Sequence, residues 1–95
     1  MQNDLGLIKQ IVNQYIDPKK NKAFIFGSRA KQNNIRFSDY DLGLSGQEID
    51  SETYFELQAA FEESNLPYKV DIVDFNKVSK KFQDIAEEKI IPLNY

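Results

Sequence analysis

The first apolar pattern in this 95-residue chain has the period of an α-helix. Apolar side chains recur at intervals of three and four residues, at Leu5, Ile8, Val12 and Tyr15. This spacing places them on one helical face, and Asp17-Pro18 is predicted to end the helix because a residue before proline disfavours helical backbone. A short aromatic run over residues 22–26 then predicts a β-strand that stops at Gly27.

The next segment changes from a helical period to a period of two. One helical turn is predicted over residues 28–32, and Asn33-Asn34 marks a loop. Between residues 37 and 45, one face carries Tyr40, Leu42 and Leu44, and the other carries Asp39, Asp41, Gly43 and Ser45. Such alternation predicts a strand that is buried on one side only.

A second amphipathic helix and a third strand follow. The helix is predicted from the spacing of Tyr54, Leu57, Ala60 and Phe61. Either Asp50 or Ser51 can cap its start, and Asn65-Leu66-Pro67 marks its end. Residues 68–75 predict the strand, in which Asp71 and Val73 face away from Val70 and Ile72.

The chain is predicted to finish with a third long helix. Its apolar positions are Phe82, Ile85, Ala86 and Ile90, and Pro92 is expected to close it. The aromatic residues at helical spacing are expected in the core: Tyr15, Tyr54, Phe61 and Phe82. The order α-β-(short α)-β-α-β-α predicts an α/β (α+β) fold, a small mixed sheet of about three strands with helices packed on one face. We expect one domain over residues 1–95.

Composition narrows the chemistry of any site. The chain has no cysteine and no histidine, which leaves oxygen ligands and a hard cation such as Mg²⁺ as the natural metal chemistry. Its net charge of −3 argues against direct nucleic-acid binding through phosphate neutralisation. No apolar run approaches the ~20 residues of a membrane span, and the N-terminus lacks a signal-peptide pattern. We therefore expect a cytoplasmic protein without a membrane partner.

Asp39 and Asp41 are the first candidates for a metal site. Two residues apart on a strand, they lie ~7 Å apart on the same face, so both carboxylates can lean over one cation. Asp71 faces the same way on its own strand and would join them if the two strands are neighbours. The alternative is that Asp39 and Asp41 are solvated residues on an open sheet face. Asp74 has the opposite parity and is interpreted as a strand-end or capping residue.

Gly27, Ser28 and Arg29 form the second candidate feature. Glycine permits close backbone approach, and amides at the start of a helix point toward an anion. Arg29 offers a planar cation suited to phosphate, or it is simply a surface residue. A Gly-Ser turn alone is a weak signal, but a strand, a Gly-Ser turn and a second strand bearing Asp-x-Asp form a more specific combination.

The combination resembles the nucleotidyltransferase superfamily with the DNA polymerase β type of catalytic core. The segments FGSRAK, SDYDL and VDIVD, and the chain length, are similar to the minimal nucleotidyltransferases encoded beside HEPN-domain toxins in prokaryotes. The resemblance covers nearly the whole chain. It departs from the pattern at Gln32, where many relatives carry a second glycine.

The resemblance implies a role for each motif residue. Gly27 and Ser28 match the phosphate-cradling turn, with Arg29 beside them. Asp39 and Asp41 match the pair that binds Mg²⁺, and Asp71 matches the third carboxylate, a metal ligand or base for the attacking hydroxyl. All three carboxylates are then both catalytic and metal-binding.

The same resemblance implies a reaction and a partner. A nucleoside monophosphate, AMP from ATP or a unit from another nucleotide, is transferred to a hydroxyl group, most plausibly a tyrosine of a HEPN-domain toxin. The chain is then an adenylyltransferase and the antitoxin of a hetero-oligomeric toxin–antitoxin pair. Two alternatives stay open: a non-catalytic subunit that neutralises its partner by masking, and a nucleotidyltransferase for a small molecule such as an antibiotic, which needs an added domain for its acceptor pocket.

Overall fold

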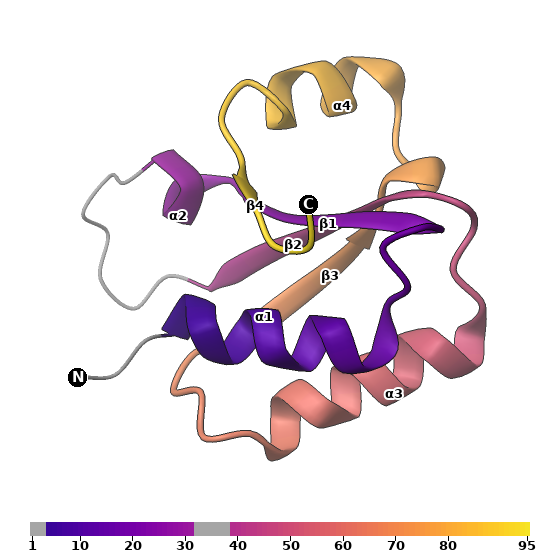
Figure 1. Ribbon diagram of the computed structural model, residues 1–95. Helices are drawn as coiled ribbons and strands as arrows, with labels where there is room; N and C mark the ends of the chain where they lie inside the picture. The colour runs from indigo at the N-terminus through magenta and orange to yellow at the C-terminus, as the bar shows by residue number, and fades with distance from the viewer. Residues whose placement is uncertain (1–3, 32–38) are drawn as a thin grey trace.

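The computed structural model describes residues 4–31 and 39–95, and these form a four-stranded sheet with helices on both faces (Figure 1). The helices are α1 (Asp4–Tyr15), α2 (Ser28–Lys31), α3 (Ser51–Glu63) and α4 (Lys80–Ala86), with a 3₁₀ turn η1 (Phe75–Lys77). The strands are β1 (Asn21–Phe26), β2 (Tyr40–Gly46), β3 (Val70–Asp74) and β4 (Ile91–Pro92). The α/β class expected from the sequence is confirmed.

The sheet is mixed and has the order β3-β2-β1-β4. Strand β1 runs antiparallel to both β2 and β4, whereas β2 and β3 are parallel. The parallel pair is possible because α3 carries the chain back between the two strands. The positions where β1 ends and where β2 and β3 begin therefore meet at one end of the sheet.

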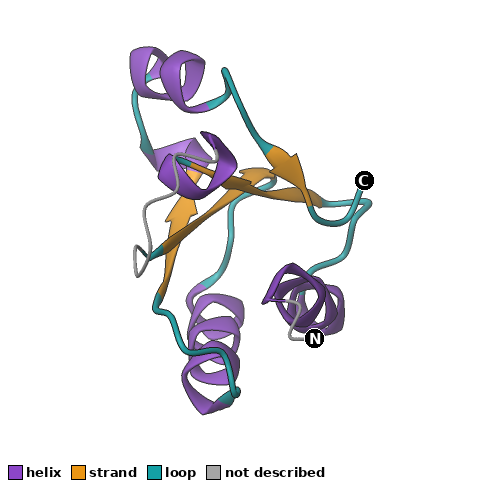
Figure 2. Cartoon of the chain, turned by 90° about the vertical axis from the view of Figure 1, so that its left-hand side faces the viewer, coloured by secondary structure: helices purple, strands orange, loops and turns teal. Residues whose placement is uncertain are grey.

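The main core lies between the sheet and helices α1 and α3, which cover the same face (Figure 2). The alternation in β2 buries Tyr40, Leu42 and Leu44 in this core, as the pattern predicts. Leu57 and Phe61 of α3 meet them there. Asp50 caps α3 by accepting a 2.7 Å hydrogen bond from the backbone N–H of Thr53.

A second, smaller core covers the opposite face. Phe24, Phe26 and Phe75 are buried together, with the rings of Phe24 and Phe75 packed edge to face at a centroid distance of 5.0 Å. Helix α4 lies on this side of the sheet (Figures 1 and 2). The expectation that the helices pack on one face is therefore wrong. The reason is that Phe24 and Phe26 of β1 face this second side, so the sheet buries apolar area on both faces.

Two predictions for aromatic residues are also wrong. Tyr15 at the end of α1 is 38% exposed, and Phe82 in α4 is 42% exposed. Tyr15 is the last residue of α1, and α4 is a short helix with no buried residue. Tyr54 is half-buried, and Phe61 is buried as expected.

The C-terminal segment differs most from the sequence prediction. Helix α4 ends at Ala86, and the chain returns as the short edge strand β4 instead of continuing helically to Pro92. The side chain of Asn94 secures this return, because its Oδ1 accepts from the N–H of Ala23 at 2.9 Å and its Nδ2 donates to the carbonyl of Asn21 at 3.1 Å. A proline is tolerated in an edge strand because the missing N–H faces away from the sheet.

Some expectations concern residues that the structure does not describe. Three features lie outside the described ranges: the loop at Asn33-Asn34, Gln32 where many family members carry a glycine, and the predicted strand start at residues 37–38. In the described part of the chain, no helix has the length and apolar character needed to cross a bilayer.

Candidate active site

Asp41 and Asp71 are neighbours across the parallel strands β2 and β3. Their Cα atoms are register partners, so both side chains leave the sheet on the same face. On its other side, Asp41 pairs with Phe26, the last residue of β1. The sheet register therefore places Asp41 next to Asp71, as the sequence predicts for neighbouring strands.

Gly27 follows directly after Phe26 and places the turn against the Asp41 carboxylate. The glycine has a φ of 77°, a left-handed conformation that side chains rarely adopt. A Cβ atom built on Gly27 would overlap Oδ2 of Asp41. Only a glycine lets the turn and this carboxylate approach so closely, and the turn continues into α2 through a 3.1 Å bond from Ala30 N–H to the Gly27 carbonyl.

The electrostatics of this cluster favour a bound cation. The pKa of Asp41 is raised, first because burial disfavours its charge and then because Asp71 and Asp39 repel it. Asp71 has a partial counter-charge in Lys69, whose Nζ lies 3.7 Å from Oδ1 of Asp71 in a solvent-exposed pair. A cation between the carboxylates would relieve the repulsion that raises the pKa of Asp41.

Of the three predicted metal ligands, Asp41 and Asp71 are neighbours in the sheet, whereas Asp39 lies outside it. Asp39 precedes β2 and is exposed, although its charge acts on Asp41. Among residues 4–31 and 39–95, no cluster of three or more acidic, histidine or cysteine side chains is close enough to hold a metal. The pair Asp41 and Asp71 still fits Mg²⁺, because this ion takes one or two protein carboxylates and completes its shell with water and substrate phosphates.

Arg29 is held by aromatic rings. Its guanidinium carbon lies 4.4 Å from the ring centroid of Tyr40 and 4.3 Å from that of Tyr68. Tyr40 in turn donates a 3.2 Å hydrogen bond from its hydroxyl to Oδ2 of Asp4 in α1. These contacts connect α2 to the sheet and to α1, so Arg29 positions the helix that begins at Ser28.

Sequence reasoning did not identify Tyr40 and Tyr68 as partners of Arg29. The three residues are far apart along the chain, so no spacing signals the contact. The nucleotide-binding roles of Gly27, Ser28 and Arg29 stay predictions, as do the catalytic and metal-binding roles of the three aspartates. Asp74, by contrast, is the capping residue that its parity indicated, because its Oδ1 accepts from the N–H of Asn76 at 2.9 Å.

An apolar hollow opens beside the turn. A pocket of about 210 Å³ is lined by Phe26, Gly27, Phe82, Ile85 and Ala86. It shares Gly27 with the carboxylate cluster, so apolar and acidic surfaces meet at this residue. The site therefore combines an acidic pair, a close-approach turn and an adjacent apolar wall.

The comparisons with known proteins agree on one family. The family described as Polymerase beta, Nucleotidyltransferase matches residues 7–92. A Haemophilus influenzae (strain ATCC 51907 / DSM 11121 / KW20 / Rd) protein named "Probable protein adenylyltransferase MntA" is 34% identical over 86 residues. That match covers 90% of this chain and 74% of the Haemophilus protein.

Solved structures with the same fold come from toxin–antitoxin complexes. One, a crystal structure of a toxin–antitoxin with AMP-PNP, matches with a TM-score of 0.73 and 25% identity, over 97% of this chain and 73% of that one. Another contains a tri-AMPylated Shewanella oneidensis HEPN toxin with its MNT antitoxin, and matches with a TM-score of 0.67 over 95% of this chain and 68% of that one. At 22% identity, the second likeness shows the fold alone.

Proposed function

Because the chain belongs to the Polymerase beta nucleotidyltransferase family, we propose that it transfers AMP from ATP to a tyrosine of a HEPN-domain partner and thereby acts as that partner's antitoxin. Nucleotidyl transfer is the chemistry of the family. What we propose is that the transferred group is AMP, that the acceptor is a tyrosine and that the partner is a HEPN-domain protein. The observation that carries it is the pairing of Asp41 with Asp71 directly beside the Gly27 turn.

The proposed reaction is a displacement at the α-phosphorus of ATP. The tyrosine oxygen forms a bond to that phosphorus, the bond to the bridging oxygen of the β-phosphate breaks, and pyrophosphate leaves with the bonding electrons. Asp71 accepts the hydroxyl proton, because β3 is an edge strand and its carboxylate is the one that an incoming acceptor meets first.

The remaining site residues bind and orient the nucleotide. The backbone at Gly27 and Ser28 faces the triphosphate, and Arg29 holds α2 in place through its two tyrosine contacts. Asp41 and Asp71 are the side chains that would hold Mg²⁺, with Asp39 at the rim. When bound, this ion neutralises the charge that builds up on the phosphates.

The relatives support the acceptor and the partner. The Haemophilus protein is named as a protein adenylyltransferase, which favours a protein acceptor over an antibiotic. The structure with AMP-PNP is a toxin–antitoxin complex, and the Shewanella complex contains an AMPylated HEPN toxin. Each of these fits an antitoxin that modifies its own partner.

The test uses the product of the neighbouring gene as the candidate HEPN-domain partner, together with Mg²⁺ and ATP labelled on either the α- or the γ-phosphate. We expect only the α-label on the partner, and we expect Asp41→Asn to reduce labelling by at least about 100-fold, as loss of a group that stabilises transition-state charge does. The variant should fold, because asparagine removes a charge that burial already disfavours. Removal of Mg²⁺ by a chelator should also stop labelling.

Asp84→Asn is the matched control, because it removes one carboxylate from the exposed ion pair with Lys80 and leaves the site intact. It should label at the wild-type rate. Transfer of the γ-label would indicate phosphoryl transfer and overturn the proposal. If Asp41→Asn still neutralises the partner as well as the wild type does, the chain is a masking subunit instead.

A further inference from the structure

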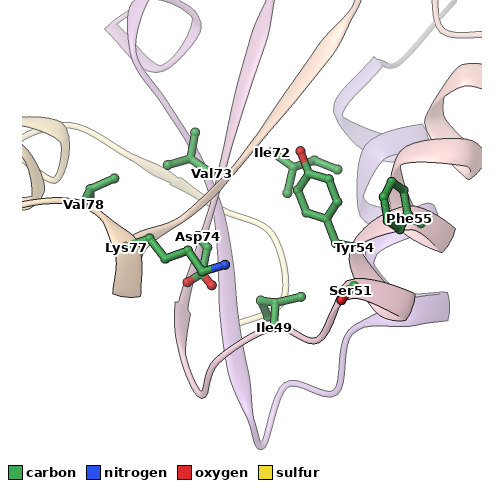
Figure 3. Close-up of a pocket in the computed structure, with 9 residues that line it drawn as sticks. All are labelled: Ile49, Ser51, Tyr54, Phe55, Ile72, Val73, Asp74, Lys77 and Val78. Atoms are coloured by element: carbon green, nitrogen blue, oxygen red, sulfur yellow. The ribbon is translucent and has the colours of Figure 1, made fainter.

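A further pocket lies away from the Gly27 turn. It has a volume of about 510 Å³ and is formed by the start of α3, the end of β3 and the segment after η1 (Figure 3). Its lining is mainly apolar, with Tyr54, Phe55, Ile72, Val73 and Val78 among the contributors. This volume lies within the range of about 300–1,000 Å³ that ligand-binding pockets have.

The pocket straddles the edge of the sheet. Ile72 and Val73 are consecutive residues of β3, so their side chains leave opposite faces of the strand, yet both line the same pocket. A single pocket reaches both faces only by passing around the strand's free edge. Among residues 4–31 and 39–95, strand β3 pairs with β2 alone, so its other side presents backbone N–H and C=O groups.

The pocket also has polar groups that a ligand can use. Oδ2 of Asp74 is buried and has no hydrogen-bond donor in the part of the chain that the structure describes, while Oδ1 of the same residue caps η1. A buried oxygen of this kind costs free energy unless a donor reaches it. Asp74 and Lys77 lie between the apolar side chains of the two pocket walls (Figure 3).

The rim of the pocket exposes an aromatic ring to solvent. Phe55 is 66% exposed, more than any other large apolar side chain of the described residues. A free strand edge, an apolar pocket and an exposed aromatic ring together match the way proteins bind extended peptides by adding a strand to a sheet.

We propose that the free edge of β3 and this pocket bind an extended segment of the protein substrate, with an apolar side chain in the pocket and a neighbouring basic side chain on Asp74. The proposal rests on the proposed function, since it takes the acceptor to be a protein. The further claim is that the edge of β3 positions the acceptor segment relative to Asp71. Asp71 and Asp74 are three residues apart on β3, a distance of ~10 Å at the usual strand rise.

That spacing connects docking with catalysis. Ile72, Val73 and Asp74 of β3 line the pocket, and a segment paired with β3 rises at the same rate, so a residue one to three positions from the one in the pocket lies beside Asp71. The docked residue sets which tyrosine reaches the carboxylates. The acceptor sequence is therefore expected to carry an apolar residue and an adjacent lysine or arginine within three positions of the modified tyrosine.

The experiment compares the steady-state kinetics of AMP transfer to the purified HEPN-domain partner for the wild type, Phe55→Glu and Asp74→Asn. Phe55→Glu places a charge on the pocket rim at an exposed position, so it should not affect folding. We expect it to raise the KM for the partner at least tenfold while the Kd for ATP is unchanged. Asp74→Asn should raise the KM several-fold, because asparagine can keep the η1 cap but loses the charge.

Tyr95→Glu is the matched control, because Tyr95 is 56% exposed and contacts Lys22 near the opposite edge of the sheet. It should leave the KM for the partner unchanged. An unchanged KM in Phe55→Glu, or an equal rise in Tyr95→Glu, would overturn the proposal. A rise in the Kd for ATP in Phe55→Glu would also count against it, since the effect would then lie in nucleotide binding.

Direct binding separates this proposal from the proposed function. The affinity of each variant for the partner is measured by calorimetry without nucleotide. If the wild type transfers no AMP but Phe55→Glu still weakens partner binding tenfold and Tyr95→Glu does not, the docking surface stands and the catalytic proposal fails. If AMP transfer occurs but Phe55→Glu binds normally, the docking proposal fails alone.

Discussion

At the residue scale, Gly27 and Asp41 constrain each other. Gly27 adopts a φ of 77°, and the space that a Cβ would need is taken by the Asp41 carboxylate. The carboxylate in turn is held in a partly buried position where Asp71 and Asp39 raise its pKa after burial has done so. The turn therefore helps to hold acidic groups close together. A bound cation would reduce the repulsion between these groups.

Replacing Gly27 by alanine tests this coupling. We expect Gly27→Ala to lower the free energy of unfolding by about 1–2 kcal/mol, the usual cost of left-handed backbone for a residue with a Cβ. AMP transfer per folded molecule should fall at least tenfold, because the added methyl displaces the Asp41 carboxylate. Stability is measured by urea unfolding and transfer by α-label incorporation.

Gly46→Ala provides the comparison for Gly27→Ala. Gly46 also has a positive φ, of 109°, and its Cβ would overlap the backbone carbonyl of Lys20, far from the carboxylates. It should lose at least as much stability, because the overlapping atom belongs to the backbone, but it should keep its transfer rate. Equal loss of transfer in both variants would mean that strain, and not the position of Asp41, controls activity.

At the element scale, the ends of the helices depend on capping and on the return of the chain. Asp50 caps α3, and Ser79 caps α4 by accepting a 3.1 Å bond from the N–H of Phe82. Helix α4 ends at Ala86, although the apolar period continues to Ile90. Ile90 packs instead on the cluster of Phe24, Phe26 and Phe75 from the segment that leads into β4.

The Asp50 cap predicts a pH dependence of stability. The pKa of Asp50 is below its ordinary value of 3.8, because the N–H of Thr53 donates to its carboxylate. The unfolded chain binds the proton more tightly, so the contribution of the charge is complete above about pH 4 and is lost as the pH falls through the lower, folded-state pKa.

Asp50→Asn removes the charge but keeps an oxygen acceptor. It should be less stable than the wild type at pH 7, and the difference should shrink when urea unfolding is repeated at pH 4, 3 and 2. A difference that stays constant over this range would show that the charge of Asp50 does not contribute to the cap.

At the scale of the whole molecule, the two cores share the strands between them. Leu42 and Leu44 of β2 belong to the core under α1 and α3, while Phe24 and Phe26 of β1 belong to the core under α4. Since β1 and β2 are paired along their full length, neither core can lose its packing without disturbing the other. The site at the end of β1, β2 and β3 depends on both.

Truncations in the two cores should therefore shift the same unfolding transition. Leu57→Ala in the first core is expected to cost about 2–5 kcal/mol and Phe75→Ala in the second about 3–5 kcal/mol. In each variant, circular dichroism and tyrosine fluorescence should report coincident midpoints in urea. Separate midpoints in Phe75→Ala would mean that the α4 side unfolds independently of the α1 and α3 side.

Local periodicity allowed much of the fold to be predicted. The period of two in β2 predicted the burial of Tyr40, Leu42 and Leu44, and the parity of β3 predicted that Asp41 and Asp71 face the same way. These properties follow from backbone geometry within a few residues, which a short sequence window contains. The family resemblance rested on the same short windows, at Gly27-Ser28 and at Asp39 and Asp41. The prediction that β2 is buried on one side only is wrong, because Phe24 and Phe75 cover Gly43 on the other face.

The tertiary structure decided everything that depends on contacts between distant segments. Local spacing gives no sign of the contact of Arg29 with the rings of Tyr40 and Tyr68, of the pairing of β4 through Asn94, or of the exposure of Phe82. The pocket around the β3 edge also depends on distant contacts. It is built from both faces of β3, from α3 and from the segment after η1. The sequence by itself thus determined most of the elements up to β3, the core-facing side of β2 and the motif residues, since these depend on neighbours along the chain. The second core, the edges of the sheet and the surfaces available to a partner were decided by how those elements pack.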